Sequence, residues 1–143
     1  MTIKQLSIFV ENKPGKLVEA LEAMSASGID LRALSLADTA DFGILRVIVD
    51  KPDLALEKLQ QAEYLVKSSE VIPVAVGDKP GGLAAVLRIL ADAGVDVEYT
   101  YAFVAHSRDN AYVILRVNDN SAAINALEDH GISILTEQQL YGM

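Results

Sequence analysis

Two short segments of the sequence combine a Pro-Gly pair with polar neighbours in a pattern that suits anion binding. They are Asn12-Lys13-Pro14-Gly15-Lys16-Leu17 and Asp78-Lys79-Pro80-Gly81-Gly82-Leu83. A helix that begins just after each pair would leave its first backbone N–H groups without intrahelical partners. These donors and the positive end of the helix dipole favour a carboxylate or a phosphate. A glycine at the turn also allows a close approach to the backbone.

A carboxylate follows each of these segments at the same distance. Asp30 comes after Gly28-Ile29 and Asp96 comes after Gly94-Val95, and we expect both near the Pro-Gly turns. Donors for a carboxylate beside an acceptor for an ammonium group describe a site for a zwitterion. The alternative is that each Pro-Gly pair only makes a sharp turn, and that Asp follows Gly because turns favour Asp.

The two segments belong to an internal repeat that covers nearly the whole chain. At a spacing of 66 residues the first Pro-Gly segment falls on the second, and 28–31 falls on 94–97. The spacing rises to 70 for 44–47 and 114–117, because four extra residues lie in the polar segment 105–111. A change in the repeat spacing that is confined to a hairpin loop indicates duplication of a folded unit. We therefore predict two domains, residues 1–68 and 69–143.

Each half is predicted to contain six elements in the order βαββαβ. Short β-rich segments precede each Pro-Gly pair, and apolar residues at helical spacing follow it. The predicted strands are 6–10, 31–37, 44–49 and 64–68 in the first half and 74–76, 97–104, 112–117 and 132–136 in the second. This is the ferredoxin-like order of an antiparallel sheet with both helices on one face, so the predicted fold class is α+β.

Composition excludes several classes of function. The net charge is −8, which disfavours nucleic acid and anionic membrane surfaces as partners. The chain has no cysteine, so disulfides and thiolate chemistry are excluded. No apolar stretch approaches the roughly 20 residues of a membrane span, and the N-terminus has no signal-peptide features. We expect a soluble cytoplasmic protein.

Catalytic constellations are not found in the sequence. There is no nucleophile–base pair, phosphate loop or cofactor fingerprint. Neither His106 nor His130 has a Cys, a second His or a duplicated partner beside it, and a metal site needs three or four clustered ligands, so surface positions are expected for both. We predict no catalytic residues, no metal site and no cofactor.

The pattern Asn/Asp-x-Pro-Gly-x-Leu, an amphipathic helix and then Gly-Ile/Val-Asp-Leu/Val resembles the ACT domain, a small regulatory module of amino-acid metabolism. The match extends over both halves, and 97–104 also resembles a subfamily of stand-alone tandem ACT proteins. The resemblance implies domains joined side by side through their second strands into one eight-stranded sheet. It also implies an amino acid bound at that interface, between the loop before the first helix of one domain and the second strand of its partner.

The family's ligand contacts can be carried over by position to both copies. The first copy would contribute Asn12, Pro14, Gly15, Lys16, Leu17, Asp30 and Leu31. The second copy would contribute Asp78, Pro80, Gly81, Gly82, Leu83, Asp96 and Tyr99. Many ligand-binding members have Asn in place of Asp30 and Asp96, and a carboxylate near the ligand's own carboxylate is unfavourable unless it faces the ammonium group. With Asp78 in place of Asn12 as well, the second copy is expected to bind more weakly or to serve as a structural partner.

The expected function is that of a non-catalytic regulatory protein that binds a free amino acid between two ACT domains. The strand 44–49 is apolar on both faces while helices cover only one, so we expect contact with a second molecule, as in a homodimer. Any regulated metabolic enzyme would be a separate protein. The alternative is a ligand-free interaction module that regulates such an enzyme by docking. RNA binding is disfavoured by the net charge and by the aliphatic third strand.

Overall fold

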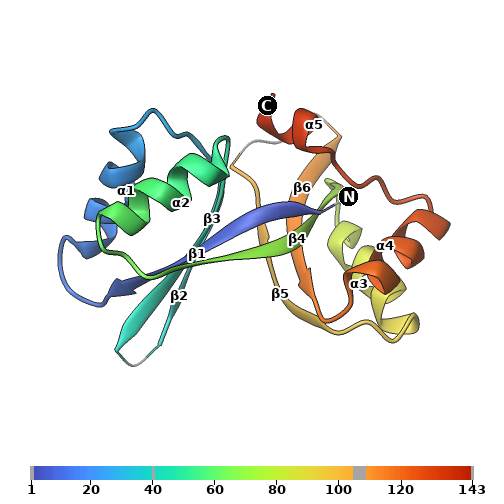
Figure 1. The fold of residues 1–143 in the computed structure, drawn as a ribbon. Coiled ribbons are helices and arrows are strands. Elements are labelled where there is room, and N and C mark those ends of the chain that lie inside the picture. The colour runs from blue at the N-terminus through green and yellow to red at the C-terminus, as the bar shows by residue number, and fades with distance from the viewer. Residues whose placement is uncertain (1, 40, 105–108, 143) are drawn as a thin grey trace. The chain divides into compact units, whose positions relative to one another are not determined.

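The computed structural model of the chain describes residues 2–39, 41–104 and 109–142 (Figure 1). Its elements follow one another in the order β1 (Ile3–Glu11), α1 (Lys16–Ser25), β2 (Leu31–Asp38), β3 (Phe42–Val49), α2 (Pro52–Gln61), β4 (Val66–Gly77), α3 (Gly82–Asp92), β5 (Val97–Ala102), β6 (Asn110–Val117), α4 (Asn120–Asp129) and α5 (Glu137–Tyr141). The chain divides into two compact units after Ser69. The first unit is Lys4–Ser69, and the second contains the residues from Glu70 onward together with Thr2 and Ile3.

The first unit is an antiparallel sheet with two helices packed on one of its faces. In this sheet β3 lies between β1 and β2, with Glu11 opposite Phe42 and Asp38 opposite Gly43. Alternate residues of β1 and β3 point toward α1 and α2 and form a buried core with the apolar stripes of these helices. The core residues with almost no exposure are Leu6, Ile8, Ala20, Met24, Leu45, Val47, Val49, Ala55 and Leu59.

The second unit repeats this arrangement with different side chains. Here β6 lies between β4 and β5, with Gly77 opposite Asn110 and Ala102 opposite Val113. One face of these strands packs against α3 and α4. The core residues with almost no exposure are Ile72, Val74, Val86, Leu90, Leu115, Val117, Ala123 and Leu127. The predicted α+β class, with antiparallel strands and helices on one face of each unit, is confirmed.

The predicted strands 64–68 and 74–76 are not separate. The structure has one continuous strand over this region, β4, because the intervening Val71 and Ile72 are extended and fully buried. β4 begins in the first unit and continues into the second. Its start follows Leu65, whose carbonyl accepts a hydrogen bond from the Phe9 amide at 3.0 Å.

The predicted strand 132–136 is reduced to an isolated bridge between Ile134 and Val74. The Leu135 amide donates to the Pro73 carbonyl at 2.9 Å, but proline has no N–H with which to return the bond. Thr136 then caps α5 through a capping box with Gln139, which turns the chain away from a strand conformation. The described residues therefore form six strands, and the predicted eight-stranded sheet is not found. Of the predicted hairpin loop 105–111, residues 105–108, including His106, lie outside the described residues.

Candidate functional site

Both Pro-Gly segments form the same turn. Gly15 (φ 85°) and Gly81 (φ 84°) are left-handed, and α1 and α3 begin at the next residue without a side-chain cap. An alanine Cβ built at either glycine would meet nothing within 4 Å. The positive φ, rather than crowding, therefore requires glycine here, and the space in front of each turn is open.

Unpaired backbone donors face this open space. The Glu19 amide donates to the Gly15 carbonyl at 3.0 Å, which is the first intrahelical bond of α1. The amides of Leu17 and Val18 precede it and have no acceptor among the described residues. The same holds for Leu83 and Ala84 in the second unit, where the Ala85 amide donates to the Gly81 carbonyl at 3.0 Å. Each turn thus presents the donors expected of an anion site.

Side chains of the first loop meet the C-terminal end of β2. The Asn12 Nδ2 donates to Asp38 Oδ1 at 3.2 Å, and this bond ties the loop to the strand. A small cavity of about 190 Å³ lies between them, lined by Asn12, Lys13 and Leu17 of the loop region and by Leu36 of β2, together with Val10, Glu11 and Gly43. The structure therefore brings several of the predicted site residues together at one end of the first unit.

Asp30 and Leu31 lie at the opposite end of the same sheet. Leu31 is opposite Val49, whereas the loop follows Glu11, which is opposite Phe42. The eight residues of β2 separate Asp30 from the loop by more than about 20 Å at ~3.3 Å per residue. The Asp30 carboxylate forms an ion pair with Arg32. The expectation that Asp30 lies beside the turn of its own copy is wrong, because the antiparallel register sends the start of β2 away from that turn.

The second copy separates its predicted residues in the same way. Asp96 donates its amide to Asn118 Oδ1 at 3.0 Å, at the end of the sheet opposite the 78–83 turn. Tyr99 is opposite Arg116 in β6 and stacks on Tyr101 with ring centroids 6.4 Å apart.

The second turn is also more tightly packed than the first. A Cβ on Gly82 would lie 2.0 Å from the Gly77 carbonyl oxygen, whereas the equivalent Lys16 carries a full side chain. Gly82 is therefore a packing glycine, and it brings no side chain to a site.

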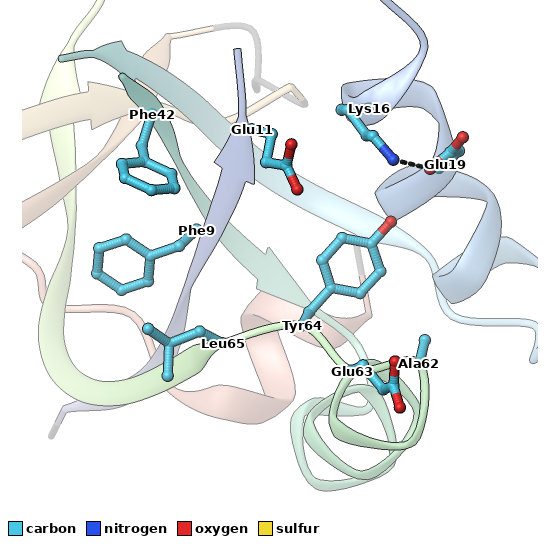
Figure 2. Close-up of a pocket in the computed structure, with 9 residues that line it drawn as sticks. All are labelled: Phe9, Glu11, Lys16, Glu19, Phe42, Ala62, Glu63, Tyr64 and Leu65. Atoms are coloured by element: carbon cyan, nitrogen blue, oxygen red, sulfur yellow. Dashed lines mark ion pairs between the residues drawn. The ribbon is translucent and has the colours of Figure 1, made fainter. Parts of the chain in front are cut away.

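A larger cavity in the first unit was not predicted from the sequence. Its volume is about 420 Å³, and it is lined by Phe9, Glu11, Lys16, Glu19, Phe42, Ala62, Glu63, Tyr64 and Leu65 (Figure 2). Burial raises the pKa of the Tyr64 phenol, the carboxylate of Glu19 raises it further, and Lys16 acts in the opposite direction. No local motif marks this cavity, because β1, α1, β3 and the segment after α2 each supply part of it.

Metal and membrane sites were also sought in the structure. Within residues 2–39, 41–104 and 109–142, no three His, Asp or Glu side chains lie close enough together to hold a metal ion. No helix in the described part of the chain is long and apolar enough to cross a membrane.

The fold and the paired turns define a class: a tandem of ferredoxin-like α+β units, each with an open glycine turn at the start of its first helix. The model of the ACT domain pair family matches residues 1–143. The chain belongs to this family, so the resemblance seen in the sequence is confirmed. No curated protein matches the chain.

Solved structures share this architecture. A protein from Bacteroides thetaiotaomicron is 38% identical and superposes with a TM-score of 0.93, over 100% of this chain and 98% of that one. The ligand-free regulatory subunit of aspartate kinase from Thermus thermophilus is 21% identical with a TM-score of 0.63, over 88% and 91% of the two chains. The corresponding subunit from Thermus flavus is 17% identical with a TM-score of 0.62, over 88% and 90%. The two kinase subunits show that the fold is shared with regulatory proteins.

Proposed function

We propose that this protein is a non-catalytic cytoplasmic regulator that binds a free amino acid at the interface between two ACT domains. The observation that carries the proposal is the open turn at Gly15, with the unpaired amides of Leu17 and Val18 behind it. This group of donors, at the positive end of α1, is suited to the carboxylate of the ligand. The Asn12 side chain and the Lys16 ammonium group lie on the same segment and add polar contacts.

The ammonium group of the ligand requires an acceptor from another domain. Asp38 already accepts from Asn12, Glu11 and Glu19 are paired with Lys13 and Lys16, and Asp30 lies at the far end of β2. If β2 pairs antiparallel with β2 of a second copy, the start of the partner strand approaches the end of the first. This pairing would bring Asp30 and Leu31 of that copy toward the Gly15 turn, where Asp30 would exchange its Arg32 partner for the ligand.

The edge of β2 supports such a pairing. Among the described residues, β2 has one neighbouring strand, β3, so its other edge carries unpaired backbone groups. Leu34 and Leu36 are 40% and 52% exposed on this strand. Burial of these leucines against their counterparts would favour a homodimer. In β5 the exposed positions are Glu98, Thr100 and Ala102, which offer less apolar surface.

The two domains of the proposal are residues 1–68 and 69–143. In the second domain the corresponding contacts would be made by Asp78, Pro80, Gly81, Gly82, Leu83, Asp96 and Tyr99, and in the first Pro14 and Leu17 complete the set. We propose that the second site is the weaker one, because Asp78 adds a carboxylate and Gly82 supplies no cation in place of Lys16. Ligand binding would order the turns and tighten the interface, and a separate metabolic enzyme would respond to that change.

The test is thermal unfolding of the protein against each of the twenty free L-amino acids. A ligand present at about 100 times its dissociation constant stabilises the folded state by roughly 2.7 kcal/mol, which raises the midpoint by several degrees at this chain length. One or two amino acids are expected to produce such a shift. A flat panel at millimolar concentrations would instead support a ligand-free docking module, for which the exposed leucines of β2 are the available surface.

A further inference from the structure

We infer that the cavity of about 420 Å³ in the first unit is a second ligand site, which takes an organic ammonium compound with an aromatic or aliphatic body and no carboxylate. Its volume falls within the range of small-molecule sites in proteins. All nine of its lining residues belong to the first unit. The described lining therefore comes from a single ACT domain.

One wall of the cavity is apolar and exposed. Figure 2 shows the side chains of Phe9, Phe42 and Leu65 on one side of β1, with Tyr64, Lys16 and Glu19 on the other. Phe42 is 48% and Leu65 is 63% exposed, and both are among the few large apolar side chains left open to solvent in the described residues. Two such residues in the same cavity provide an apolar surface for the body of a ligand.

The polar part of the cavity carries an excess of negative charge. Glu11, Glu19 and Glu63 contribute three carboxylates, against one ammonium group from Lys16. Lys16 Nζ is 3.5 Å from Glu19 Oε2, so this cation is already matched. A ligand cation would relieve the remaining excess, whereas a ligand carboxylate would add to it.

Of the other two carboxylates, Glu63 is the one left without a cation. Glu11 Oε2 is 3.2 Å from Lys13 Nζ, a solvent-exposed pair. Glu63 has no ion pair with any residue that the structure describes. Among the carboxylates of the lining residues, that of Glu63 is therefore the one free to pair with the ammonium group of a ligand.

The internal repeat shows that this chemistry belongs to the first copy alone. The two copies are equivalent here at the level of backbone hydrogen bonds: the amides of Phe9 and Ala75 donate to the carbonyls of Leu65 and Ser133, each at 3.0 Å. At the positions of the three carboxylates, the second copy has small residues with no charge. Glu11, Glu19 and Glu63 correspond to Gly77, Ala85 and Gly131.

The backbone at Glu63 has the same conformation as its counterpart in the second copy. Glu63 is left-handed (φ 67°), and no other residue except glycine has a positive φ in the described chain. Gly131, its counterpart, has the same conformation (φ 73°) without strain. The first copy therefore retains a glutamate at a position where glycine folds more easily, and its side chain lines the cavity. In both copies this residue closes the helix before it: the amides of Glu63 and Tyr64 donate to the carbonyls of Gln60 and Leu59, each at 3.0 Å.

The experiment is calorimetric titration of the full-length protein with three probes that share a phenyl ring: 2-phenylethylamine, 3-phenylpropionate and phenylalanine. We expect 2-phenylethylamine to bind at least about tenfold more tightly than 3-phenylpropionate, the difference expected for one charge-assisted contact. Phenylalanine tests whether an added carboxylate is tolerated. In the Gly15→Asn variant, which blocks the proposed amino-acid site, it should bind more weakly than the amine. Equal affinities for the amine and the acid would overturn the inference, as would absence of amine binding at millimolar concentration.

Variants locate the site without relying on the Pro-Gly turn. Glu63→Gln and Phe42→Ala should each weaken amine binding by about tenfold, whereas Glu57→Gln, on the exposed surface of α2, should bind like the wild type. Glu63→Gly removes the carboxylate and relieves the left-handed strain, so it should lose amine binding and melt at or above the wild-type temperature. Unchanged binding in Glu63→Gln would contradict the assignment. None of these residues belongs to the proposed amino-acid site. Absence of amine binding would therefore overturn the role of the cavity alone, and absence of a thermal shift with the twenty amino acids would overturn the amino-acid site alone.

Discussion

At the scale of single residues, glycines of the two Pro-Gly segments are required for different reasons. Gly15 and Gly81 are required by their positive φ, and a Cβ at either position would meet open space. Gly82 is required by the Gly77 carbonyl oxygen, which a Cβ would approach to 2.0 Å. The sequence motif does not distinguish these cases, because both appear in it only as glycine.

These two causes predict different costs of substitution. Gly15→Ala should lower the free energy of unfolding by about 1–2 kcal/mol, the cost of a left-handed non-glycine residue. Gly82→Ala should cost more, about 2–3 kcal/mol or above, because backbone atoms have to move. Urea unfolding of both variants measures the difference. Equal destabilisation would show that the β4–α3 contact at Gly82 is looser than the structure has it.

The raised pKa of Tyr64 predicts that the folded protein loses stability at alkaline pH. Burial, followed by the Glu19 carboxylate, raises its pKa above the ordinary value of 10.0 in the folded state. The folded protein therefore disfavours the phenolate, so the stability is fully present below the unfolded pKa and is lost as the pH rises through the folded one. In Tyr64→Phe this loss should be smaller. Unfolding midpoints of both proteins from neutral pH to above pH 10 provide the test, and parallel curves would contradict it.

At the scale of elements, the strands and first helices could be predicted because local chemistry determines them. A Pro-Gly pair ends a strand and leaves apolar residues at helical spacing, so α1 and α3 begin just after Gly15 and Gly81 as the pattern indicates. The position of Asp30 could not be predicted in this way. It depends on the antiparallel register of β2 and β3, which is a long-range property. The final predicted strand failed because Pro73 cannot return a ladder bond.

The exposed edge of β2 leads to a prediction about the oligomeric state of the protein. Leu36→Asp places a charge on the exposed apolar edge, so it should shift the protein from dimer to monomer while the first unit stays folded. Sedimentation equilibrium measures the mass. Ala91→Asp, on the exposed surface of α3, is the control and should leave the dimer intact. A monomeric wild type, or a dimer that survives Leu36→Asp, would contradict association through β2.

At the scale of the whole molecule, duplication has produced two units with the same fold and different surfaces. The repeat in the sequence was sufficient to predict the family, because it preserves the residues that form turns and cores. The cavity of the first unit was not predictable from that repeat. Its acidic residues come from β1, α1 and the segment after α2, and at each of these positions the second copy has Gly or Ala. Divergence between the copies, rather than their likeness, marks this cavity.

The most direct test of the central claim compares two variants in the amino-acid panel. Gly15→Asn keeps a residue that tolerates the left-handed conformation but puts a side chain into the open space in front of α1. Gly131→Asn makes the same change at a left-handed position of the second unit that is not part of a Pro-Gly turn. The wild type and Gly131→Asn should both be stabilised by the same one or two amino acids. Gly15→Asn should lose that thermal shift, or most of it. An equal shift in all three proteins would place the amino acid elsewhere and contradict the account.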